Sequence, residues 1–104
     1  MKHQLVIQFP LADAGVEDFE RLMMFENELR VVLRPEHMVD GHDLGVDKMN
    51  IFINTDDPNG AFTLAKDILM EADLKTILVA YRDFDSEEYV FMWPENFSGE
   101  FWIK

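Results

Sequence analysis

The chain has 104 residues, of which 21 are acidic and 9 basic, so its formal net charge at pH 7 is −12. This length predicts a single domain over residues 1–104, and a hydrophobic content of 48% excludes a disordered chain. The basic residues are scattered, which argues against nucleic-acid and anionic-membrane partners, and the absence of cysteine excludes disulfides and thiolate chemistry.

The N-terminal part of the chain predicts a strand followed by a helix. Apolar residues alternate with Gln4, Val6 and Gln8 over residues 3–9, as in a half-buried strand that ends at Pro10. Residues 13–33 predict a helix that stops before Pro35. Its buried face would carry Phe19, Leu22, Met23, Leu29, Val32 and Leu33.

The middle of the chain predicts a turn-rich segment and then a strand. Residues 36–48 contain Gly41 and Gly45, so we expect turns here, with at most a short edge strand over residues 36–39. Residues 49–54 alternate and predict a strand with Asn50, Phe52 and Asn54 on one face.

The C-terminal half predicts one helix, two strands and a tail. Asp57 as N-cap and Pro58 at the first helical position start a helix that ends near Asp73. Strands are predicted over residues 75–82 and 88–93, the second with Tyr89, Phe91 and Trp93 on one face. The aromatic tail, residues 95–104, is expected to pack back onto the body of the domain.

This order of elements resembles the ferredoxin-like fold. The predicted order is βαββαβ followed by an extra C-terminal strand or tail. The resemblance implies an α+β two-layer sandwich, in which two helices cover one face of an antiparallel sheet and leave the other face open. It is a resemblance of topology, and this fold carries many unrelated functions.

The open sheet face is the first candidate interaction surface. It would present Gln4, Gln8, Asn50, Phe52 and Asn54, and Trp102 from the tail is the aromatic residue that we expect to anchor an interface. A protein partner and a homodimer both fit such a face, and a cover formed by the tail is the alternative.

The second candidate is the segment from His37 to Asp47. Its site residues would be Asp40, His42, Asp43 and Asp47, with His37, His42 and Asp43 as the candidate metal ligands. The spacing matches neither a helical zinc motif nor an EF-hand, so a polar loop in which the aspartates cap turns is the alternative.

A third candidate lies at the strand-to-helix junction. Asp56 joins Asp57 there, and two carboxylates at a helix N-terminus would repel a phosphate. The structural interpretation is that Asp57 is simply the N-cap.

Three functions follow from these features. We expect first a small acidic, non-catalytic interaction module, such as an inhibitor or antitoxin-like binder of a basic protein. The alternatives are a ligand-sensing regulatory domain that dimerises and a metal-dependent enzyme that uses the His37–Asp47 segment. No nucleophile motif or cofactor motif is present, and with no signal peptide or membrane span predicted we expect a cytoplasmic location.

Overall fold

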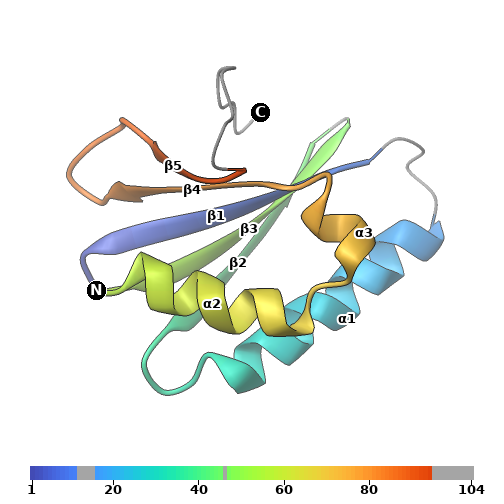
Figure 1. Ribbon diagram of the computed structural model, residues 1–104, viewed down its shortest axis with the longest axis horizontal. Coiled ribbons are helices and arrows are strands. Elements are labelled where there is room, and N and C mark those ends of the chain that lie inside the picture. Colours follow the sequence, from blue (N-terminus) through green and yellow to red (C-terminus); the bar gives the residue numbers. More distant parts are fainter. Residues whose placement is uncertain (12–15, 46, 95–104) are drawn as a thin grey trace.

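The computed structural model describes residues 1–11, 16–45 and 47–94. The chain forms an α+β domain in which helices lie on one face of an antiparallel sheet (Figure 1). Its elements are β1 (His3–Pro10), α1 (Val16–Val32), β2 (Met38–Leu44), β3 (Lys48–Thr55), α2 (Pro58–Ile68), α3 (Glu71–Leu74), β4 (Leu78–Asp83) and β5 (Val90–Trp93).

The sheet has five strands in the order β2-β3-β1-β4-β5, and every neighbouring pair is antiparallel. The central strand β1 has a neighbouring strand on both sides and is buried at every residue from Leu5 to Phe9, so it is not the half-buried strand that the sequence predicted. The predicted antiparallel sheet is therefore confirmed, and β5 is the expected extra strand at its edge.

The hydrophobic core lies between the sheet and the helices. Leu5, Ile7 and Phe9 of β1 point toward the helices, where they meet Leu22 and Leu29 of α1, and all five are buried. The alternation predicted for β1 and β3 is correct, since the register pairs Leu5 with Ile53 and Ile7 with Ile51 on the same face. Two residues predicted to lie on the buried face of α1, Phe19 and Val32, are instead each 38% exposed.

The turn-rich segment is the largest departure from the sequence prediction. It forms a seven-residue strand, β2, and not the short strand predicted over residues 36–39. The pairing with β3 shifts by one residue between Val39 and Gly41, which is a β-bulge at Asp40. Gly41 has a φ of 139°, a backbone conformation that residues with a Cβ avoid, so glycine here permits the bulge and does not end the strand.

The predicted second helix is interrupted. α2 ends at Ile68, Leu69 and Met70 adopt extended backbone angles, and α3 then forms a separate short helix. The pairing of β5 with β4 is also irregular. Trp93 lies opposite Val79 and Phe91 opposite Ala80, so the predicted single aromatic face of this strand is wrong.

Within the described residues, no helix is both long enough and apolar enough to cross a membrane.

Candidate functional site

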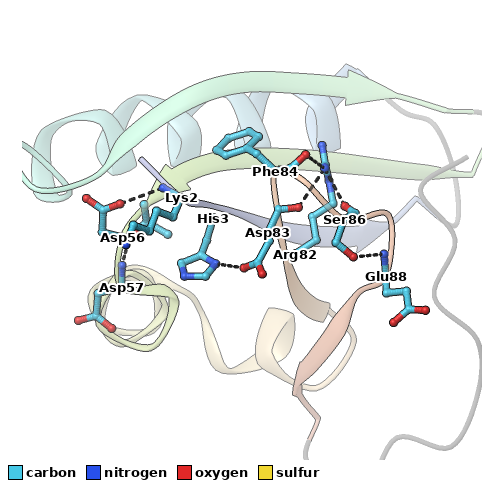
Figure 2. A network of polar contacts seen from close by, with 10 residues as sticks. Lys2, His3, Asp56, Asp57, Arg82, Asp83, Phe84, Ser86 and Glu88 are labelled. Carbon is cyan, nitrogen blue, oxygen red and sulfur yellow. Dashed lines mark hydrogen bonds and ion pairs between the residues drawn. The ribbon is translucent and has the colours of Figure 1, made fainter.

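Four carboxylates gather at one end of the sheet, and we call Glu36, Asp56, Asp57 and Asp83 the acidic end. The strand pairing explains why they meet: His3 at the start of β1 lies opposite Thr55 at the end of β3 and opposite Asp83 at the end of β4. Figure 2 shows Asp56, Asp57 and Asp83 grouped around the first residues of the chain. Glu36 joins them from the connection between α1 and β2, where it lines the same pocket as Asp56 and Asp57.

Thr55 is the buried support beneath the acidic end. Its side chain is inaccessible to solvent, and its Oγ1 accepts a hydrogen bond of 2.8 Å from the backbone N–H of Asp57. The same oxygen is hydrogen-bonded, at 2.6 Å, to Nδ1 of His37, which is itself only 6% exposed. One hydroxyl therefore joins the end of β3, the start of α2 and the segment that precedes β2.

The N-terminus of α2 positions Asp57. Its carboxylate accepts the backbone N–H of Gly60 at 3.1 Å, and Pro58 follows at the first helical position, so the predicted N-cap is confirmed. A Cβ at Gly60 would overlap the Asp57 carboxylate, so glycine is required for this cap to form without a shift. The cap uses one of the two carboxylate oxygens, and Asp57 remains exposed.

Two further contacts hold Asp56 and Asp83 at this end (Figure 2). Asp56 accepts the backbone N–H of Lys2 at 2.9 Å, which attaches the N-terminal residues to the junction after β3. Nδ1 of His3 lies 2.6 Å from a carboxylate oxygen of Asp83, whose side chain is 61% exposed. The sequence predicted Asp56 as a site residue, but its pairing with Lys2 across 54 positions has no local signal.

A pocket of about 500 Å³ opens between these groups. Glu36, Asp56 and Asp57 contribute negative charge to its wall, and His37, Gly60 and Leu64 complete the lining. Among the described residues, none of the three carboxylates forms an ion pair with a lysine or arginine. This arrangement favours an ammonium or guanidinium group and disfavours an anion.

The structure does not bring the candidate metal ligands together. His37 turns toward Thr55, His42 turns toward α1, and Asp43 lies opposite Asn50 on the other face of the sheet. Asp40 occupies the bulge, and Asp47 lies beyond the end of β2, where its carbonyl accepts the N–H of Leu11. In the described parts of the chain no group of three or more His, Asp or Glu side chains could hold a metal ion.

A polar contact between Glu26 and His42, which the sequence did not indicate, joins α1 to β2. The side chain of Glu26 is only 6% exposed, and its oxygens lie 3.2 and 3.3 Å from Nδ1 of His42. Arg30, one turn further along α1, lies 3.9 Å from the same carboxylate. Glu26 lies one helical turn from Leu22 and from Leu29, and residues at this spacing share one face of a helix. The burial of Glu26 could therefore have been predicted from the apolar spacing of α1.

The predicted sheet-face residues do lie on one face, as three cross-strand pairs. Gln4 is opposite Asn54, Val6 opposite Phe52 and Gln8 opposite Asn50. Gln8 donates a hydrogen bond of 3.0 Å to Asn50, and both are buried, so the centre of this face is not the open surface that the sequence predicted. Gln4, Phe52 and Asn54 are half-buried, and Trp102 lies outside the described residues.

Comparison of the chain with protein-family models, curated proteins and solved structures found no match to any of them.

Proposed function

We propose that this protein is a non-catalytic interaction module that binds a basic protein, as an inhibitor or antitoxin does. The observation that carries the proposal is the acidic end, where Glu36, Asp56 and Asp57 line a pocket. None of these three carboxylates forms an ion pair with a lysine or arginine among the described residues. The net charge of −12 extends the same electrostatic preference over the whole molecule.

The rigid support of these carboxylates favours a specific contact over diffuse attraction. Thr55 and the α2 N-cap position Asp57, and the backbone N–H of Lys2 holds Asp56, so a lysine or arginine side chain entering the pocket meets two carboxylates that are already in place. The exposed carboxylates elsewhere would steer the partner toward this protein and raise the association rate.

Affinity capture tests this proposal. The tagged protein is incubated with lysate of its source organism, washed at low and then high salt, and the retained proteins are identified by mass spectrometry. We expect a stoichiometric basic protein that high salt releases, because screening weakens exposed charge pairs. A matched bait with Glu36→Gln, Asp56→Asn and Asp57→Asn should retain much less of it, and Asp57→Asn keeps an N-capping residue.

Two outcomes would contradict the proposal. A bait that captures no stoichiometric partner, or the same partner in equal amount with and without the three carboxylates, would remove its basis. A control bait that neutralises three exposed carboxylates elsewhere, Asp67→Asn, Glu71→Gln and Glu87→Gln, separates loss of these particular charges from an equal general loss of charge.

We infer a ferredoxin-like sandwich because the first four strands occur in the order β2-β3-β1-β4, with α1 and α2 following β1 and β3. The strand β5 and the short helix α3 are additions to that arrangement. A cytoplasmic location also belongs to the proposal and is supported by the absence of cysteine.

One observation favours a second candidate function, ligand sensing. A pocket of about 410 Å³ between α2 and β5 is lined by Phe62, Tyr81 and Trp93, with the Lys66 ammonium 5.0 Å from the Phe62 ring centroid. Aromatic walls and one cation suit a small aromatic acid. Quenching of tryptophan fluorescence by such acids, with Lys66→Met as the variant, would test it, and equal quenching in both proteins would count against it.

A further inference from the structure

The strand β2 is an edge of the sheet with an unpaired outer side. Its single neighbour among the described strands is β3, so the backbone groups that point away from β3 have no strand partner there. Arg30 of α1 donates a hydrogen bond of 3.2 Å to the carbonyl of Val39, next to the bulge. The regular edge that remains available therefore runs from Gly41 to Leu44.

The side chains along this edge combine apolar and acidic groups. Two apolar side chains are exposed here, Leu44 at 52% and Phe19 of α1 at 38%. The Phe19 ring lies edge-on to the His42 ring, with 6.3 Å between the ring centroids. Asp40 and Asp43 are exposed on the same strand, and neither forms an ion pair within the described part of the chain. An occupant must therefore offer apolar side chains and positive charge together.

A second copy of this chain does not meet that requirement. Pairing of two β2 strands would bring the Asp40 and Asp43 carboxylates of both copies onto one edge, in two molecules that each carry a charge of −12. Like charges on an edge strand discourage it from pairing with a second copy of itself. The same carboxylates attract a strand that carries lysine or arginine.

We propose that an extended, basic segment of the partner adds as a strand to β2 along residues 41–44. Main-chain hydrogen bonds supply the geometry, Phe19 and Leu44 contact the apolar side chains of the segment, and Asp43 pairs with a basic one. This inference rests on the proposed function, because it identifies the part of a basic partner that the protein recognises.

Binding of a short synthetic peptide tests the inference. The probe alternates lysine with valine and has blocked ends, and its affinity is measured by calorimetry at low salt. We expect Asp43→Lys to weaken binding about tenfold, because the change replaces one attractive contact with a repulsive one. The matched control is Glu87→Lys in the β4–β5 connection, at the opposite edge of the sheet, which should bind nearly as well as the unmodified protein.

Two further measurements separate strand addition from simple charge attraction. A peptide of the same sequence that is N-methylated at alternate residues keeps its charge but lacks the backbone donors, and it should bind much more weakly. Amide hydrogen exchange, followed by NMR, should slow in β2 when the unmodified peptide binds. Circular dichroism of Asp43→Lys tests whether a loss of affinity comes from unfolding. The milder variant Asp43→Asn removes the charge without reversing it and serves as a second test.

The remaining outcomes contradict the docking site, the strand addition or the proposed function, one at a time. If the peptide binds equally to the Asp43→Lys variant, or if exchange slows only around Asp56 and Asp57, the β2 edge is not the docking site and the proposed function stands. If the N-methylated peptide binds as well as its parent, strand addition is wrong. If affinity capture also finds no basic partner, the proposed function fails together with this inference.

Discussion

Replacing Thr55 by valine should destabilise the protein more than replacing it by serine. Valine keeps the shape of threonine but removes the hydroxyl that serves both His37 and Asp57. Serine keeps the hydroxyl and removes one methyl group. Because Thr55 is inaccessible to solvent, no water replaces the missing oxygen without entering the core.

The burial of His37 determines how much stability Thr55→Val should cost. A buried polar group left without a partner costs about 1–3 kcal/mol, and Nδ1 of His37, in a residue only 6% exposed, falls in this class. The Asp57 N–H is closer to solvent and adds less. We therefore expect Thr55→Val to lower the free energy of unfolding by about 2–3 kcal/mol. Thr55→Ser should lower it by about 1 kcal/mol, the transfer free energy of one buried methyl group.

Urea unfolding followed by circular dichroism measures both values, and a double-mutant cycle isolates the cause. A loss of 2 kcal/mol shifts the urea midpoint by about 1 M for a domain of this size. In a His37→Leu background both partners are apolar, so Thr55→Val should cost much less there than in the unmodified protein. A cost that is the same in both backgrounds, or a valine variant as stable as the serine variant, would refute the reasoning.

Three further predictions concern contacts elsewhere in the protein, all measured by urea unfolding. His42→Ala should cost about 1.5–3 kcal/mol, because it leaves Glu26 buried without its main partner, and the cost should fall in a Glu26→Gln background. Gly60→Ala should destabilise α2 by about 0.5–2 kcal/mol through loss of the Asp57 cap, although helix propensity alone predicts a gain. Gly41→Ala should cost about 1–2 kcal/mol from backbone conformation only, since a Cβ there would contact nothing within 4 Å, and an unchanged midpoint would contradict its positive φ.

The sequence predicted the elements whose signals are local. Alternation fixed the faces of β1 and β3, because a central strand that packs against helices must carry apolar residues at every second position. Asp57 and Pro58 marked the start of α2, since capping depends only on neighbouring residues. The break between α2 and α3 had no such signal, because neither glycine nor proline occurs at Leu69 or Met70.

The supports of the acidic end could not be predicted for the same reason. Asp56 and Asp57 stand together in the sequence, but the bond from Thr55 to His37 spans 18 positions and that from Asp56 to Lys2 spans 54. Such pairs depend on the strand order, which the alternation of apolar residues does not specify. The sequence therefore indicated the candidate site only as two aspartates, and it did not indicate the hydrogen bonds that support them.

The histidines of the predicted metal segment show how a strand separates residues that a loop would bring together. Met38 lies opposite Asn54 on the face away from the helices, and a regular strand would place His42 on that same face, four residues later. The bulge at Asp40 adds one residue and reverses the alternation, so His42 lies opposite Ile51 and faces α1. Only there does its ring reach the buried carboxylate of Glu26. Gly41, which the sequence indicated as a turn former, thus permits the bulge that directs the His42 ring toward Glu26 and away from His37.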